Sequence, residues 1–192
     1  MEKNQSKRER KGKREKAFKK KTSSQSRCDL KAKIKAIQIE KEGLDTNFLL
    51  SYFNNFPNFI GVFAQDQLEH LIIKSATISF VVNFDFSNQT GSHWIAIKIS
   101  KSSLEIFDSL GFSKSSWDKK PKILIKFLLQ FKDSHKIFIT PQLQAEQSIL
   151  CGVYCIFFLF YRLHFSFQKC VSIFSTDLLK NDKILLNHVL KL

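Results

Sequence analysis

An α+β fold is what this chain of 192 residues predicts, and three successive patterns lead to it. Residues 45–74 place apolar side chains at helical spacing, and residues 77–107 alternate apolar with polar side chains and are rich in β-branched residues. Residues 116–192 return to helical spacing around one further strand. A hydrophobic content of 43%, with 20 Phe against 6 Gly and 3 Pro, supplies the material for one packed interior.

Residues 1–30 form a basic segment that precedes the folded part, residues 31–192. Much of the net charge of +14 lies in this segment, and such a charge run cannot bury itself, so we expect it to be disordered when alone. We expect it to be attracted to polyanions, with nucleic acid the first candidate and anionic membrane the second. A nuclear import signal is a third interpretation, and a solvated segment without a partner is the alternative to all three. The candidate nucleic-acid contacts are Lys11, Lys13, Arg14, Lys19, Lys20 and Lys21.

The first helix is predicted over residues 45–53, with Asp45 as its N-cap. Residues 56–61 then read as a loop, and residues 64–74 as a second short helix with an apolar face. Before them, residues 29–39 fit either a short helix or a strand.

A β-section follows, in which residues 77–82, 94–99 and 104–107 have strand chemistry. The last two runs are joined by residues 100–103, the pattern of a hairpin. His93 and Asp108 stand at ends of these strands, and antiparallel pairing would bring both side chains to the same edge of the sheet.

The remaining elements are predicted from periodicity and capping. We expect a helix within 116–131, a strand over 136–140, a Gln-rich loop over 141–148, an apolar helix over 149–165 and an amphipathic helix over 175–192.

The cysteines indicate a reducing, intracellular setting rather than secretion. The N-terminus is charged where a signal peptide needs an apolar region, and the longest apolar run, 149–161, is shorter than the roughly 20 residues that cross a bilayer. Cys151 and Cys155 are four positions apart, but no second Cys or His pair at zinc-site spacing accompanies them, so no metal site is expected. The other two cysteines are Cys28 and Cys170.

Cys151 is the candidate nucleophile. It stands between a turn and the apolar helix, and helix N-termini favour the thiolate over the thiol. Gly152 leaves room for a substrate backbone to approach. Taken alone, an apolar-flanked Cys is more often a small core residue. A catalytic role for Cys151 therefore depends on the other motifs that accompany it in the chain.

Three phrases occur in a fixed order: residues 91–94 (GSHW), residues 106–112 (IFDSLGF), and Gln144 seven positions ahead of residues 151–155 (CGVYC). Together they resemble the adenovirus protease family, adenain, whose clan includes the ubiquitin-like-protein proteases. In that family a His-Trp opens one strand, an acidic residue ends the next, and a Gln precedes a Cys-Gly helix start. The acid here is Asp where adenain has Glu.

The resemblance covers roughly residue 56 to the C-terminus. Residues 56–63 and 66–68 also look like the adenain-like proteases of Polinton or Maverick elements and adintoviruses, as do residues 174–177 with Asn181 and Asp182. It implies an adenain-like cysteine protease domain over 31–192, with a central mixed β-sheet flanked by helices and the catalytic Cys at the start of a buried helix.

By resemblance, His93 is the general base, Asp108 orients it, Cys151 attacks, and Gln144 donates to the oxyanion together with the Cys151 backbone N–H. Trp94 would shield the site and, with Gly152, contact substrate. Gln142 and Gln147 are rival oxyanion donors, and Asp118 is a distant alternative acid.

Members of the family cut viral precursor proteins at Gly-containing sites, and adenain is stimulated by DNA. The resemblance therefore implies a polypeptide substrate such as a capsid precursor, no required cofactor, DNA as an activator, and a location in the host nucleus or virion. Two alternatives are an (iso)peptidase acting on ubiquitin-like proteins and an inactive protease scaffold that binds nucleic acid.

Overall fold

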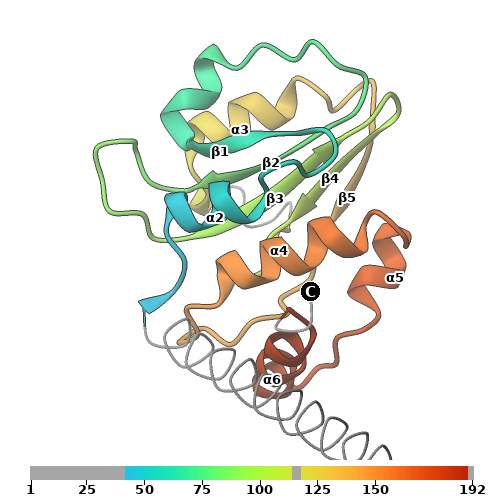
Figure 1. Cartoon of the computed structure of the whole chain (residues 1–192). Coiled ribbons are helices and arrows are strands. Elements are labelled where there is room, and N and C mark those ends of the chain that lie inside the picture. Colours follow the sequence, from blue (N-terminus) through green and yellow to red (C-terminus); the bar gives the residue numbers. More distant parts are fainter. Residues whose placement is uncertain (1–41, 114–117, 190–192) are drawn as a thin grey trace, which may run out of the picture. The chain divides into compact units, whose positions relative to one another are not determined.

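The computed structural model describes residues 42–113 and 118–189 (Figure 1). The basic segment 1–30 and the open prediction for residues 29–39 lie outside the described residues. The amphipathic helix predicted to residue 192 is described to Val189. In the described part of the chain, no helix is long and apolar enough to span a membrane.

A five-stranded sheet of order β1-β2-β3-β4-β5 forms the centre of the described domain. The two outer pairs, β1 with β2 and β4 with β5, are parallel, whereas β2-β3 and β3-β4 are antiparallel. The sheet is therefore mixed, as predicted. Its strands are β1 (Phe59–Ala64), β2 (Ile78–Asn83), β3 (Trp94–Ile99), β4 (Ser103–Phe107) and β5 (Lys136–Ile139).

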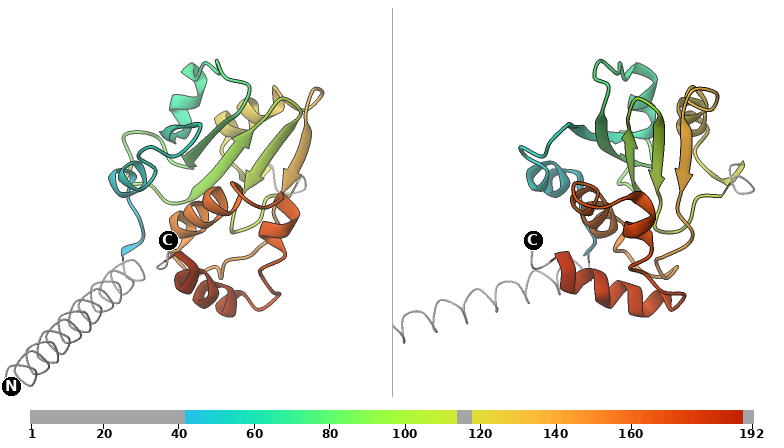
Figure 2. Two further views of the ribbon diagram at one scale, coloured as in Figure 1. Left: turned by 45° about the vertical axis from the view of Figure 1, so that its right-hand side comes forward. Right: turned by 90° about the vertical axis from the view of Figure 1, so that its right-hand side faces the viewer.

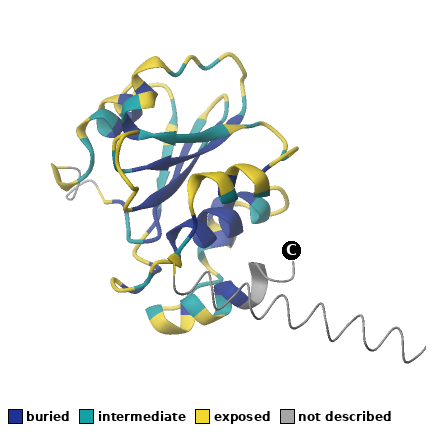
Figure 3. Cartoon of the chain, turned by 60° about the vertical axis from the view of Figure 1, so that its left-hand side comes forward, coloured by how far each residue is buried: buried dark blue, intermediate teal, exposed yellow. Residues whose placement is uncertain are grey.

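Both faces of the sheet are covered, because apolar side chains point to both sides of its central strands. On β3, Trp94 and Ala96 belong to one core and Ile95 and Ile97 to the other. All six residues of β2 are buried. Figure 3 shows the buried residues concentrated in the sheet and in α4. Near-continuous apolar runs of this kind are expected where a sheet is packed on two sides.

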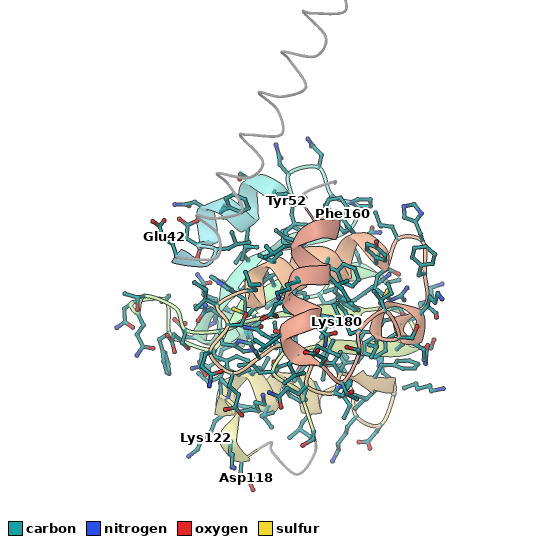
Figure 4. All side chains as sticks on the ribbon, turned by 90° about the horizontal axis from the view of Figure 1, so that it is seen from below. Glu42, Tyr52, Asp118, Lys122, Phe160 and Lys180 are labelled. Atoms are coloured by element: carbon teal, nitrogen blue, oxygen red, sulfur yellow. The ribbon has the colours of Figure 1, made fainter. Side chains whose placement is uncertain are left out.

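The first face carries α2 (Thr46–Tyr52), α4 (Cys151–Tyr161), α5 (Phe167–Val171) and α6 (Leu178–Val189), of which α4 packs against β3 and α6 packs beyond it (Figures 1 and 2). The ring of Phe107 stacks on that of Phe158 in α4 with centroids 4.4 Å apart. From α2, Tyr52 meets Phe160 edge-on at 5.6 Å, and the two side chains lie side by side in Figure 4.

The second face carries the 3₁₀ helix η1 (Gln65–His70) and α3 (Lys122–Leu129). Their residues Leu68, Leu124 and Phe127 close this core. The helix predicted within 116–131 is thus confirmed over its central part, with Pro121 directly before its first residue.

Two predictions in the N-terminal half are wrong. Residues 56–61 are not all loop, because β1 begins at Phe59 and pairs in parallel with β2, a contact that local sequence does not reveal. The helix predicted over 64–74 is only the 3₁₀ turn of η1, since Gln65 N–H is bonded to the carbonyl of Asp85 and the carboxylate of Asp66 accepts from Ser87. These long-range hydrogen bonds take the place of the hydrogen bonds that would extend η1 into a longer α-helix.

Further along the chain, the predicted apolar helix begins at Cys151 rather than at residue 149 and ends at Tyr161. The short α5 that follows was not predicted. The helix of residues 45–53 and the hairpin of β3 and β4 are confirmed, with Asp45 accepting the Phe48 N–H at 2.7 Å.

Candidate active site

The hairpin of β3 and β4 brings His93 and Asp108 together. Ala96 pairs with Phe107, so the residue before β3 and the residue after β4 lie at the same edge of the sheet, as predicted. The Nε2 atom of His93 lies 2.7 Å from Oδ1 of Asp108. His93 is 7% exposed and Asp108 is 0% exposed, so this pair lies in the interior.

Several donors hold the Asp108 carboxylate. Its Oδ1 also accepts the Leu110 N–H at 3.0 Å, and its Oδ2 lies 2.6 Å from Nζ of Lys120. The Asp108 backbone is fixed by Thr140, whose hydroxyl accepts the Asp108 N–H at 2.9 Å and donates to the Asp108 carbonyl at 2.6 Å. Burial raises the pKa of Asp108, but His93 and Lys120 outweigh it, so the net pKa is lowered and the group is a carboxylate.

The protonated form of His93 is favoured. Burial lowers the pKa of His93, but the bond to Asp108 and the interaction with the Cys151 thiol raise it to about 9. Because Nε2 is engaged by Asp108, the ring nitrogen left to face the thiol is Nδ1. The ring of Phe84 packs edge-on against the imidazole at 4.8 Å and fixes its plane.

Cys151 is the first residue of α4 and is 7% exposed. No side chain caps the start of this helix in the described part of the chain, and Leu150 occupies the N-cap position. The first N–H groups of a helix have no intrahelical acceptor, and they stabilise negative charge placed beside them. Cys151 therefore lies beside backbone N–H groups that favour negative charge.

Gln144 is bonded to both halves of the site. The Ser109 hydroxyl donates to its Oε1 at 2.6 Å, and its Nε2 donates to the Ser148 carbonyl at 2.5 Å. The backbone N–H groups of Leu143 and Gln144 both donate to the Ser109 carbonyl. Gln144 is 1% exposed, so its amide has a fixed orientation between the residue after Asp108 and the turn before Cys151.

The rival residues lie elsewhere. Gln142 and Gln147 are exposed, and the Gln142 amide donates to the Gln144 carbonyl at 3.3 Å. Asp118 is exposed and lies near Lys122 at the margin of the molecule (Figure 4). The residues that the structure brings together are thus His93, Asp108, Gln144 and Cys151.

Trp94 and Gly152 both contact a segment that the sequence did not connect with the site. The Trp94 indole N–H donates to the Leu44 carbonyl at 2.8 Å. A Cβ added at Gly152 would lie 3.0 Å from the Cβ of Leu44. The space beside Gly152 is filled by Leu44, so the reason we gave for this glycine, room for a substrate backbone, is replaced by close packing of the chain itself.

Helix α6 stabilises the loop that carries Gln144 through hydrogen bonds. Asn181 is fully buried, and its Nδ2 donates to the carbonyls of Leu143 and Ser175 at 2.9 Å each. The Tyr154 hydroxyl lies 3.0 Å from the Leu143 carbonyl and 2.9 Å from Oδ1 of Asp182. The pair Asn181 and Asp182, which carried part of the sequence resemblance, therefore helps to position the loop.

The other cysteines in the described part of the chain are Cys155 and Cys170. Burial raises the pKa of Cys155 well above its ordinary value and raises the pKa of Cys170 to about 11, so both stay protonated at neutral pH. Among the described residues, no group of three or more His, Cys, Asp or Glu side chains could hold a metal ion.

A pocket of about 460 Å³ lies between the 145–150 loop and α6. Its walls include Ile149, Leu179 and Leu186, with Asp182 and Lys183 as charged groups. None of His93, Asp108, Gln144 and Cys151 lines it. The pocket therefore borders the 145–150 loop rather than the four candidate site residues.

Sequence reasoning missed Lys120, Ser109 and Leu44. Lys120 stands in a chain with 31 Lys and Arg residues, so nothing marked it out. Ser109 could have been found, because it directly follows Asp108 within the phrase that carried the resemblance.

Comparison with known proteins finds a likeness in structure. No protein-family model matches the chain, and no curated protein matches its sequence. Among solved structures, the chain is similar to the ASFV pS273R protease, with a TM-score of 0.43 and 20% sequence identity. The similarity covers 74% of this chain and 66% of that protein, so the chain spans slightly less than two thirds of that protein's length.

Proposed function

We propose that this chain is a cysteine endopeptidase. One observation carries the proposal: the buried His93–Asp108 pair, at 2.7 Å, has the Cys151 thiol as the other partner of its imidazole, at the start of a helix. A nucleophile, a base and a group that orients the base are the parts that thiol-dependent acyl transfer requires.

In the proposed reaction, the Cys151 thiolate attacks the carbonyl carbon of the scissile amide, and His93 holds the proton. The Sγ–C bond forms, and the carbonyl oxygen becomes an oxyanion that accepts from Gln144 and from the Cys151 N–H. His93 then gives its proton to the leaving amine as the C–N bond breaks. A water molecule, deprotonated by His93, hydrolyses the thioester and releases the acid.

The substrate class is a polypeptide. On the resemblance to adenain-like enzymes, we propose that the natural substrates are structural precursor proteins of a virus or mobile element, cut at Gly-containing sites. We also propose that DNA activates the enzyme through the basic residues of segment 1–30, and that the chemistry needs no cofactor. A ubiquitin-like C-terminal tail, which the same chemistry would cut, is the second candidate substrate.

The test is covalent labelling of the full-length protein by a thiol-directed peptidyl electrophile. We expect the label on Cys151, and a much slower reaction in His93→Ala, because the imidazole no longer takes the thiol proton. Cys151→Ala is the matched control for labelling of Cys28, Cys155 and Cys170. Labelling of Cys151 no faster than of Cys28 would refute a peptidase and leave the nucleic-acid-binding scaffold.

The substrate is then identified with two panels. Glycine-containing precursor peptides and ubiquitin-like proteins are each incubated with wild type and with Cys151→Ala, with and without duplex DNA over a salt series. Cleavage of precursor peptides supports the endopeptidase, whereas exclusive cleavage after a C-terminal Gly-Gly supports the (iso)peptidase. A rate that does not change with DNA, or with deletion of residues 1–28, removes the proposed activation.

A further inference from the structure

Lys120 is a largely buried cation that contacts Asp108. Its Nζ lies 2.6 Å from Oδ2 of Asp108 and donates to the Gly111 carbonyl at 3.0 Å. It also lies over the rings of Phe84 and Phe112, at 5.2 and 5.3 Å from their centroids. Its side chain is only 12% exposed. Lysines are rarely buried this far unless they are paired, so the contact with Asp108 accounts for its position.

The Asp108 carboxylate divides its two oxygens between two cations. Oδ1 faces the His93 ring and the Leu110 N–H, and Oδ2 faces Lys120. The carboxylate has no exposed surface, so solvent does not compensate its charge. The groups that contact the carboxylate therefore set the relative free energies of protonated and neutral His93.

We propose that Lys120 is a positioning residue of the reaction: it holds Asp108 as a carboxylate and compensates its charge when His93 gives its proton to the leaving amine. This proposal rests on the proposed function. Before the transfer, the oxyanion and Asp108 carry two negative charges, and the imidazolium and Lys120 carry two positive charges. After it, Cys151 is acylated and neutral, His93 is neutral, and Asp108 is left with Lys120.

Without Lys120 the same step would leave a buried carboxylate beside a neutral imidazole. That state is costly, so His93 would retain its proton and the amine would leave slowly. Alkylation of the thiol by iodoacetamide needs no such transfer, because iodide leaves without a proton. Loss of Lys120 should therefore affect amide hydrolysis more than alkylation.

The other groups near the His93–Asp108 pair do not replace this cation. Cys151 of α4 supplies negative charge when ionised, and Cys155, one turn further along α4, is held protonated by burial. Phe84 contacts the ring but carries no charge. In the described part of the chain, the positive partner of Asp108 besides His93 is Lys120.

The experiment compares full-length wild type, Lys120→Met, Lys120→Gln and Lys120→Arg. Met and Gln are one atom shorter than Lys and remove its charge, and Arg keeps the charge. In the Met and Gln variants we expect amide hydrolysis to fall about tenfold and iodoacetamide alkylation of Cys151 to change by less than about threefold. Lys120→Arg should recover most of the hydrolysis.

A second readout does not depend on turnover. NMR titration of His93 in the Cys151→Ala background leaves Asp108 and Lys120 as the charged groups under test. Lys120→Met should raise the pKa of His93 by about one unit, because a nearby positive charge is removed. An alkaline shift of the same sign is expected in the pH profile of hydrolysis.

Three results would overturn the proposal: an unchanged His93 titration, equal losses of hydrolysis and alkylation, or an Arg variant as impaired as Met. A purely structural role predicts lower stability with the same pH profile. If Lys120→Met does not fold, the Gln and Arg variants provide the test, through the loss of amide hydrolysis relative to the loss of alkylation. If wild type fails to hydrolyse any peptide, the proposed function fails, and the His93 titration still tests the role of Lys120.

Discussion

The Nε2 atom of His93 lies 2.7 Å from Oδ1 of an Asp108 carboxylate that has no exposed surface. Since Asp108 is ionised, this nitrogen carries the proton that it donates, and Nδ1 is left to face Cys151. The orientation of the imidazole and the charge that favours its protonated form thus come from one contact, and several measurable properties depend on it.

Asp108→Asn should lower the pKa of His93 and slow the proposed peptide hydrolysis. The amide keeps the size of the side chain but loses the negative charge, and it leaves Lys120 buried without its carboxylate. We expect peptide hydrolysis to fall by at least about a hundredfold. The pH profile of alkylation and an NMR titration of His93 measure both effects. A His93 titration that stays near 9 would show that another group sets it.

The stability of the fold should depend on pH through His93. Its pKa is raised in the folded state, from 6.5 to about 9, so its contribution is fully present below 6.5 and is lost as the pH rises through 9. We expect the free energy of unfolding to fall by about 2 kcal/mol between pH 6.5 and 8.5. Urea titrations at several pH values measure this slope, and His93→Gln should abolish it.

Ser109→Ala should slow peptide hydrolysis without changing the reactivity of the Cys151 thiol. The variant removes the hydroxyl that donates to Gln144 Oε1 at 2.6 Å, so the amide is no longer held in one orientation. We expect kcat/KM for a peptide to fall about tenfold, with alkylation of Cys151 unchanged. In a Gln144→Ala background the same substitution should cost nothing further, and an equal loss there would contradict the coupling.

Asn181→Ala should destabilise the Gln144 loop. It removes the amide that donates to the Ser175 carbonyl, and one of the two donors to the buried carbonyl of Leu143. We expect the free energy of unfolding to fall by about 2–4 kcal/mol in urea titrations. Lys180→Ala is the matched control on the same helix, because Lys180 is exposed (Figure 4), and it should change stability by less than about 0.5 kcal/mol. Equal effects of the two variants would contradict the stabilising role of α6.

Gly152→Ala should be destabilising because of Leu44 rather than because of the helix. The new Cβ would lie 3.0 Å from the Cβ of Leu44, and forced contacts of this kind cost about 1–3 kcal/mol. Alanine otherwise favours a helix over glycine, so in a Leu44→Gly background, which removes that Cβ, the same substitution should be neutral or stabilising. Thermal unfolding of the four proteins of this cycle measures the coupling. Additive effects would mean that the two residues do not meet.

Much of the site's geometry followed from the sequence, because it depends on a hairpin. The turn at residues 100–103 fixes the pairing of β3 with β4, and this pairing brings His93 and Asp108 to one edge. The start of α4 at Cys151 was displaced by only two residues from the prediction. By contrast, β1 was missed, because its assignment depends on parallel pairing with a strand that follows a 3₁₀ turn.

By itself, the sequence determined the α+β class, the hairpin and the order in which the residues His93, Asp108, Gln144 and Cys151 occur. These features depend on local periodicity and on turns, which a single chain carries in its own spacing. Only the tertiary structure decided that Lys120 pairs with Asp108, that Ser109 orients Gln144 and that Leu44 fills the space beside Gly152. Each of these contacts joins side chains from separate segments, and their partners are selected by burial, where an unpaired charge or amide is costly.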